Sequence, residues 1–210
     1  MRRNYPEEAV IFIASLFSSQ EVFNNAAPRL RDLFGRVYYE STPMPWNFSA
    51  YYNGELGAPL YRHFMFFENI VDPVFLVDAK LAMCEIEKEF STGGNRQINL
   101  DPGYMSLAKV VLASRKNYSH RIYLGRGVFC ELELFYQEGR FNPLPYTYFD
   151  YRDDHFLAFF TKARLLLKKK LDGKKRLMQN DTVLTPEGYG QEINEEVKSL
   201  PDIIPEAKDL

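Results

Sequence analysis

Polar and charged side chains that suit ligand binding concentrate in residues 99–123. The set consists of Asn99, Asp101, Tyr104, Lys109, Lys116, His120, Arg121 and Tyr123. An Arg guanidinium can bind a phosphate through two parallel hydrogen bonds, whereas a Lys ammonium supplies a point charge. His is the side chain whose unperturbed pKa permits proton transfer near neutral pH. The segment therefore suggests an anion site, with Arg121 as a bidentate clamp, Lys116 as a point charge and His120 as an acid or base.

The same residues also have a purely structural interpretation. Asp101 would cap a short helix over residues 104–108, His120 would be a hydrogen-bonded residue of a sheet, and the cations would be solvated. Clustered charges are common in structural networks, so the residues alone favour this interpretation. The sequence does not decide whether the protein is an enzyme. In an enzyme, His120 would be the general acid or base and Arg121 would neutralise developing charge.

Several other chemistries find no support in the sequence. No His, Asp or Glu spacing is typical of a zinc site, and no metal site is predicted. The P-loop pattern of Gly, four residues, Gly, Lys and Ser or Thr is absent. Cys84 and Cys130 are the only cysteines, too few for a disulfide framework, and Cys130 is interpreted as a small buried hydrophobe. The sequence leaves the cofactor unknown.

Residues 1–100 show the pattern of strand, helix, strand, strand, helix, strand. The apolar run at 9–16 predicts a buried strand. Ser18 and Glu21 have capping-box spacing before a helix that ends at Gly35, although Pro28 predicts a kink or a late start. Strands are predicted at 37–41, 61–67 and 97–100, with a structured loop at 43–48, a possible helical turn at 51–57 and a helix from Asp72 to about Phe90.

The second half of the chain shows paired strands and one more helix. Residues 106–114 fit a helix or a strand, and a helix with an extended exit is favoured. Strands at 120–124 and 128–136 flank a glycine-bounded hairpin loop at 125–127. In the second of these strands Glu131 and Glu133 are predicted on a partly wet face and Cys130 on the core face. The Asp101 strand is predicted to turn at Pro102 and Gly103.

The last helix is predicted to begin near Asp153, with a buried stripe at five positions. These are Phe156, Phe160, Ala163, Leu167 and Leu171. A run of six basic residues follows at 168–176, which could meet nucleic acid but is more typical of a solvated helix end. The chain is therefore divided into one α+β domain at 1–177 and a polar C-terminal extension at 178–210.

Composition limits the class of protein. The chain has 210 residues, 26 Lys plus Arg and 28 Asp plus Glu, and a net charge of -2, which argues against a basic nucleic-acid coat. Hydrophobic residues make up 46%, enough for a core at this length. Neither a run of roughly 20 apolar residues nor a signal peptide is present. The sequence predicts a cytoplasmic protein without a membrane partner and leaves the oligomeric state undecided.

Segments of the chain resemble an uncharacterised bacterial family known as domain of unknown function 4416. The resemblance lies in 99–104, 107–116 and 120–124, continues in 145–151, and includes Asp72 with Pro73. It covers about residues 7–165. Members are sometimes labelled GTP-binding proteins, a label to which the missing P-loop gives little physical support. The resemblance implies that residues 99–123 form a shared functional surface; Asn117 and Cys130 depart from the family pattern outside the proposed anion clamp.

Together these observations predict an α+β fold with a mixed or antiparallel sheet of ferredoxin-like split βαβ character, covered by about three helices. The expected function is binding of a phosphorylated or nucleotide-like small molecule in a cleft with His120. The ligand-binding residues are predicted to be Asn99, Asp101, Tyr104, Lys109, Lys116, Arg121, Tyr123, Tyr148 and Asp150. The alternative is a non-catalytic module that contacts a protein or RNA partner through Tyr-rich loops.

Overall fold

The structure is a computed structural model that describes residues 6–180. Its main element is a nine-stranded sheet in the order β11-β10-β8-β7-β1-β4-β2, with β3 beside β4 and β9 beside β10. All strand pairs are antiparallel. The strands of this sheet are β1 (Ala9–Phe17), β2 (Val37–Glu40), β3 (Met44–Trp46), β4 (Leu60–Val71), β7 (Ile98–Met105), β8 (Lys109–Ser114), β9 (Ile122–Gly125), β10 (Val128–Gln137) and β11 (Arg140–Pro143). The predicted α+β class with a large antiparallel sheet is confirmed.

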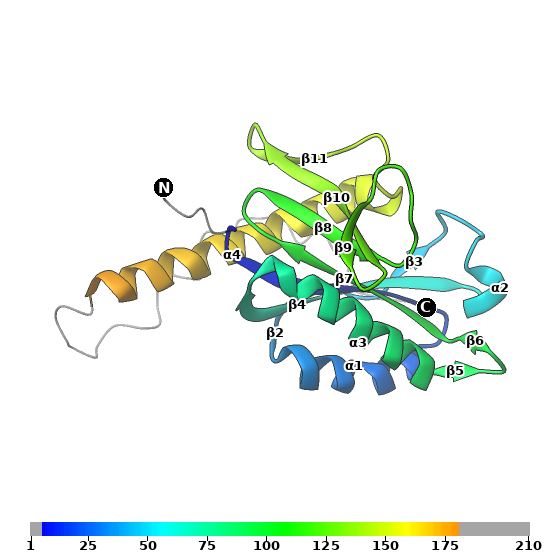
Figure 1. Cartoon of the computed structure of the whole chain (residues 1–210). Coiled ribbons are helices and arrows are strands. Elements are labelled where there is room, and N and C mark those ends of the chain that lie inside the picture. The colour runs from blue at the N-terminus through cyan, green and yellow to red at the C-terminus, as the bar shows by residue number, and fades with distance from the viewer. Residues whose placement is uncertain (1–5, 181–210) are drawn as a thin grey trace, which may run out of the picture.

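Within the described residues, four α-helices accompany the sheet: α1 (Gln20–Phe34), α2 (Asn53–Leu56), α3 (Leu76–Glu89) and α4 (Asp154–Asn180). Helices α1 and α3 lie side by side on one face (Figure 1), where Leu30 and Met83 pack on Ile13 and Met65. Helix α4 packs on the other face, where Phe160 contacts the rings of Phe12, Phe64 and Phe66. The central strands are therefore buried on both sides, which suits β1, whose residues are all apolar apart from Ser15.

The smaller elements complete the chain. The helical turn η1 (Pro73–Phe75) precedes α3, and Asp72 caps it by accepting from the Val74 amide at 3.0 Å. Strands β5 (Ser91–Thr92) and β6 (Asn95–Arg96) form a separate two-stranded ribbon, and η2 (Asp150–Arg152) precedes α4. The buried stripe predicted for α4 is confirmed at all five positions. Among the described residues, no helix is both long and apolar enough to cross a membrane.

The predicted helix at 106–114 is wrong, because residues 109–114 form β8 between β7 and β10. Val110 and Val111 fit both patterns, but both faces of β8 are covered, and a continuous apolar run suits such a strand. The predicted turn at Pro102 and Gly103 is also wrong, since β7 continues through both residues to Met105. Pro102 is tolerated because pairing with β8 begins only at Gly103.

Three smaller predictions need correction. Helix α1 is capped by Ser19, not Ser18, and begins at Gln20 despite Pro28. Ser18 instead donates to the Leu56 carbonyl. Residues 44–46 of the predicted loop form an edge strand beside β4. The β9–β10 turn has two residues, Arg126 and Gly127, both at positive φ.

The predicted extension begins at 178, but α4 continues to Asn180 and residues 181–210 lie outside the described part of the chain. The extension and the domain boundary therefore stay predictions.

Candidate functional site

A small hollow of about 90 Å³ lies where β7 and β8 diverge. The two strands pair at only three positions, from Gly103 with Leu112 to Met105 with Val110. Residues 98–102 of β7 therefore separate from the far end of β8, and the gap is lined by side chains from α3, from β6 and from the segments before α2, after β8 and before η2. The hollow is lined by Tyr52, Lys80, Cys84, Glu87, Arg96, Asn99, Asp101, Leu112, Ala113, Ser114, Arg115, Lys116 and Tyr148.

The inner wall is a chain of buried polar groups that starts at Lys80 of α3. Its ammonium donates to the Asp101 carboxylate at 2.9 Å and to the Leu100 carbonyl at 3.0 Å. Asn99 donates to the other Asp101 oxygen at 2.6 Å. Because Asn99 and Asp101 are two positions apart on one strand, their side chains share a face, as the sequence predicted.

Arg96 joins this wall to α2 and α3. Its guanidinium contacts both carboxylate oxygens of Glu55 at 2.6 and 2.8 Å, Glu87 at 3.2 Å and Asn99 at 2.8 Å. Glu87 also accepts from the Leu100 amide at 2.6 Å. Lys80 and Glu87 are seven positions apart, so they occupy the same buried stripe of α3 two turns apart.

Burial and charge compete at these groups. Burial acts to raise the pKa of Asp101, but the charge and hydrogen bond of Lys80, with Arg62 and Asn99, outweigh it and lower that pKa. Burial similarly opposes the charged form of Lys80, yet Asp101 and Glu87 raise its pKa. The Lys80–Asp101 pair is therefore ionised. For Glu87 burial prevails and raises the pKa above its ordinary value, despite the charges of Lys80 and Arg96.

The rim of the hollow carries less constrained cations. Lys116 is exposed; its ammonium lies 3.0 Å from the Tyr51 hydroxyl and 4.4 Å from the centre of that ring. Arg115 is also exposed and donates to the Arg126 carbonyl at 3.0 Å. Neither side chain has a carboxylate within ion-pair distance among the described residues.

Arg121 holds the outer wall in place instead of facing the hollow. Its side chain is 2% exposed. Its guanidinium donates to Glu131 at 3.0 Å, Ser114 at 2.7 Å, the Lys116 carbonyl at 3.0 Å and Tyr148 at 2.8 Å, and Nη2 also lies 2.7 Å from the Glu131 carboxylate as an ion pair. All three guanidinium nitrogens thus contact protein acceptors, so this arrangement differs from the ligand clamp that the sequence suggested.

The contacts of Arg121 also orient two hydroxyl groups. Ser114 accepts from Arg121 and from the Lys116 amide, and Tyr148 accepts from Arg121. Since their lone pairs receive these hydrogen bonds, both hydroxyl protons are available to a ligand. Burial, with the Asp101 charge, raises the pKa of Tyr148 and of Tyr52, which keeps both phenols protonated.

His120 does not line the hollow. Its Nε2 lies 2.7 Å from the buried Glu131 carboxylate, which also binds Arg121. The ring stacks on Tyr146 at 4.6 Å between centroids. A carboxylate that holds one ring nitrogen fixes the orientation of the imidazole, the arrangement seen in many catalytic and metal-binding histidines. Among the described residues, no group of three His, Cys, Asp or Glu side chains is placed to hold a metal ion.

Four other residues of the predicted site lie elsewhere. Lys109 is at the opposite end of β8 from Ser114. Tyr123 is on β9, 60% exposed, and accepts from the Gly127 amide. Tyr104 packs between two apolar clusters. Asp150 is buried, accepts from Trp46 at 2.9 Å and from Arg62 Nε at 3.0 Å, and forms an ion pair with Arg62 Nη2 at 2.9 Å.

The predicted wet face of β10 is wrong, because Glu131 and Glu133 are 2% and 0% exposed. The segments before β9 and before η2 cover this face: Arg121 binds Glu131, and the Tyr148 amide donates to Glu133 at 3.2 Å. Sequence reasoning also missed Lys80, Glu87 and Arg96. The signal for the first two was their place on the apolar stripe of α3, where charged residues need partners.

A family model described as Domain of unknown function (DUF4416) matches residues 7–166, a range that contains every residue lining the hollow. No curated protein and no solved structure matches the chain.

Proposed function

The chain belongs to the family described as Domain of unknown function (DUF4416), and we propose that it binds the phosphoryl group of a small phosphorylated molecule in the hollow between β7 and β8. The observation that carries the proposal is the excess of positive charge around this hollow. Lys80, Arg96, Arg115 and Lys116 line it, against the carboxylates of Glu87 and Asp101.

The inner cations form ion pairs with carboxylates, whereas the rim cations Arg115 and Lys116 form none among the described residues. Lys80 pairs with Asp101, and Arg96 pairs with Glu55 and Glu87. Arg115 and Lys116 can therefore turn toward an anion without breaking an ion pair among the described residues. Ser114, Tyr52 and Tyr148 supply neutral donors. A phosphoryl dianion binds well where cationic and neutral donors converge.

The volume limits what enters. About 90 Å³ is well below the roughly 300 Å³ of sites that enclose a whole drug-sized ligand. This space suits a phosphoryl group, while the organic part of the ligand would remain outside, near the exposed rings of Tyr51 and Tyr148. Arg121 acts in this proposal as a positioning residue, since it orients Ser114 and Tyr148. The proposal concerns binding; His120 has no contact with the hollow.

The test compares two lysines at opposite ends of β8. Inorganic phosphate and phosphomonoesters should raise the melting temperature of the full chain, because a ligand that binds only the folded state stabilises it. Lys116→Met should weaken phosphate affinity about tenfold, a loss of roughly 1.4 kcal/mol. Lys109→Met, the matched control outside the hollow, should bind as the parent does. Equal loss in both variants, or no stabilisation by any phosphate, would refute the proposal.

Thiol labelling gives a second readout of the same site. Cys84 lines the hollow and Cys130 does not. Burial raises the pKa of both thiols, so alkylation should be slow and best followed at alkaline pH. Bound phosphate should slow the labelling of Cys84 relative to Cys130. Unchanged labelling of Cys84 at saturating phosphate would place the anion elsewhere.

The second candidate function is contact with a protein or RNA partner through exposed aromatic loops. It is supported by the exposed side chains of Tyr118, Ile122, Tyr123 and Phe149. Exposed apolar side chains serve as interaction sites where they gather in one patch. This alternative predicts that phosphate does not raise the melting temperature and that Lys116→Met has no effect on the response to phosphate. The same experiment therefore separates the two candidate functions. The cytoplasmic location remains an expectation from the sequence.

We also propose that the core is ferredoxin-like. The support is the order β7-β1-β4-β2 with antiparallel neighbours, in which α1 connects β1 to β2 and α3 connects β4 to β7. An experimental structure with a different order of these four strands would refute it.

A further inference from the structure

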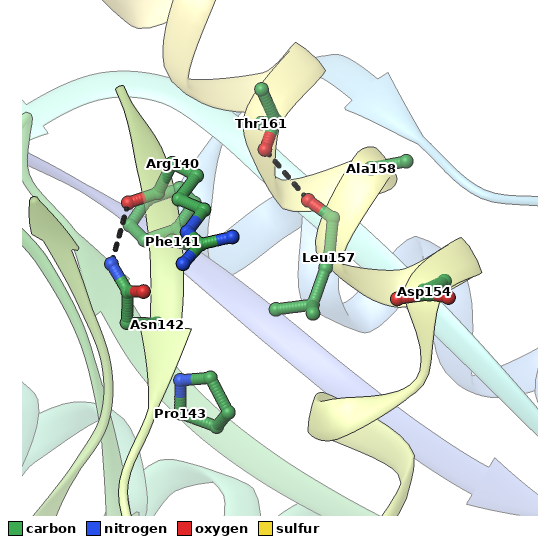
Figure 2. A pocket seen from close by; sticks show the side chains of 8 residues that line it. All are labelled: Arg140, Phe141, Asn142, Pro143, Asp154, Leu157, Ala158 and Thr161. Atoms are coloured by element: carbon green, nitrogen blue, oxygen red, sulfur yellow. Dashed lines mark hydrogen bonds between the residues drawn. The ribbon is translucent and has the colours of Figure 1, made fainter. Parts of the chain in front are cut away.

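A second hollow lies between β11 and the first two turns of α4 (Figure 2), with a volume of about 420 Å³. Strand β11 contributes Arg140, Phe141, Asn142 and Pro143, and α4 contributes Asp154, Leu157, Ala158 and Thr161. The four helical positions recur at intervals of three and four, so they form one face of α4. No residue of the β7–β8 hollow takes part, and this site is independent of the function proposed above.

One wall of this hollow is a sheet edge. Among the described strands, β11 pairs with β10 on one side and with no strand on the other. The backbone N–H and C=O groups along a free edge can hydrogen-bond an extended peptide that adds as a further strand. The apolar side chains of Phe141, Pro143, Leu157 and Ala158 line the space beside this edge.

The hollow contains one cationic and one anionic side chain, and neither is paired within the described residues. Arg140 and Asp154 are both exposed, and within residues 6–180 neither side chain has an ion pair or hydrogen bond. In Figure 2, Arg140 lies at the end near Thr161, and Asp154 lies toward the other end. Four residues of strand and seven helical steps each span about 10 Å, so the hollow is about that long.

We propose that this hollow binds a short apolar peptide of two or three residues with free termini. Its carboxylate would bind Arg140, its ammonium group would bind Asp154, and its backbone would lie antiparallel along β11. Three extended residues span about 10 Å at the usual 3.3 to 3.6 Å per residue, which matches the length of the hollow, whereas a single amino acid covers about a third of it. Apolar side chains of the peptide would cover Leu157 and Ala158.

Calorimetric titration of the full chain with trialanine, N-acetyl-trialanine and trialanine amide tests the proposal. The free peptide should bind, and blocking either terminus should weaken affinity about tenfold or more, as expected for a lost charge-assisted contact. Arg140→Met should bind trialanine and its amide equally, and Asp154→Asn should bind trialanine and its acetylated form equally. Each variant thereby identifies the terminus that its side chain recognises.

Lys109→Met, which removes a cation outside the hollow, should retain the full discrimination among the three peptides. Circular dichroism checks that the variants fold, which their exposed positions lead us to expect. Absence of trialanine binding at millimolar concentration in the folded parent chain would overturn the proposal. Equal affinity for the free and capped peptides, or variants that keep the parent's discrimination, would overturn it as well.

Discussion

Glu133 is a fully buried carboxyl group with only one of its oxygens hydrogen-bonded. Oε2 accepts from the Tyr148 amide at 3.2 Å, whereas Oε1 has no partner. Burial raises its pKa well above the ordinary value, and the neighbouring Glu131 charge adds to that effect. The protonated form is therefore the one that suits the fold, since a neutral carboxyl costs less to bury than an unpaired carboxylate.

The buried carboxyl group of Glu133 should make the stability of the protein depend on pH. Its folded pKa lies above its unfolded value near 4.5, so its contribution to stability is complete below that value and is lost as pH rises through the folded pKa. Glu133→Gln keeps an oxygen for the Tyr148 amide and cannot ionise. The variant should gain stability relative to the parent as pH rises, measured as the free energy of unfolding in urea.

Glu138→Gln is the control, because Glu138 is exposed at the β10–β11 turn. Its pH profile should follow that of the parent. If the free energy of unfolding of Glu133→Gln also changes with pH as that of the parent does, Glu133 is not a buried neutral carboxyl group.

Strand β7 depends on Gly103 for its place in the sheet. A Cβ at this position would lie 2.2 Å from Cζ of Phe12 and 2.6 Å from the Val111 carbonyl oxygen. The ring of Phe12 is itself fixed between Phe66 and Phe160, at 5.1 and 5.6 Å. A side chain here would thus push β7 away from both the core and β8, at the point where the two strands begin to diverge.

Gly103→Ala should therefore destabilise the protein by roughly 3 kcal/mol, the upper part of the usual range for overpacking, because a backbone oxygen cannot move aside like a side chain. Chemical denaturation measures the loss. Gly54→Ala in α2 is the matched control, since a Cβ there meets nothing within 4 Å and Ala favours helix over Gly. Equal stability of the two variants would contradict the close contact at Gly103.

The whole molecule is held together by apolar layers on both faces of the sheet, and His63 is a titratable group inside one of them. It is 4% exposed on β4, and its ring lies 4.5 Å from that of Phe23. Burial lowers its pKa from 6.5 to about 4. The Glu40 carboxylate lies 3.8 Å away but is 44% exposed, so solvent screens it and burial prevails.

Acid should consequently unfold the protein in part through His63. The folded pKa is the lower one, so the stability that neutral His63 contributes is complete above pH 6.5 and is lost as pH falls toward 4. The full loss is roughly 3 kcal/mol, at about 1.4 kcal/mol per pKa unit. His63→Gln should remove this component from the pH dependence of the free energy of unfolding. The exposed His155→Gln should retain it; an unchanged slope in His63→Gln would contradict the assignment.

Much of the fold follows from local patterns. The mostly apolar run of β1, the five-position stripe of α4 and the Asp72 cap are signals contained within a few residues, and the structure confirms each. The prediction for residues 106–114 was wrong because their apolar residues fit both the period of a helix and that of a strand. Only the neighbours of β8 in the sheet select the strand, and these neighbours come from other parts of the chain.

The candidate site was predictable only in part. Lys116, Asn99 and Asp101 do meet at one hollow, while Lys109 and Tyr123 lie apart from it. The prediction assumed that residues close together in the sequence lie close together in space. This is wrong for an extended strand, because each residue adds about 3.3 Å to its length. The partners Lys80, Glu87 and Arg96 come from α3 and the β5–β6 ribbon, which no spacing within 99–123 could reveal.

The sequence by itself determined the α+β class, most helices and strands, and the family of this chain, since these depend on periodicity and on short motifs. Only the tertiary structure decided which charges are buried, which are paired and which remain available. Arg121 shows the reason: a free guanidinium and one whose three nitrogens are all bound to protein acceptors look the same in the sequence. The difference arises when Glu131, Ser114 and Tyr148, from separate segments, are brought into hydrogen-bond distance.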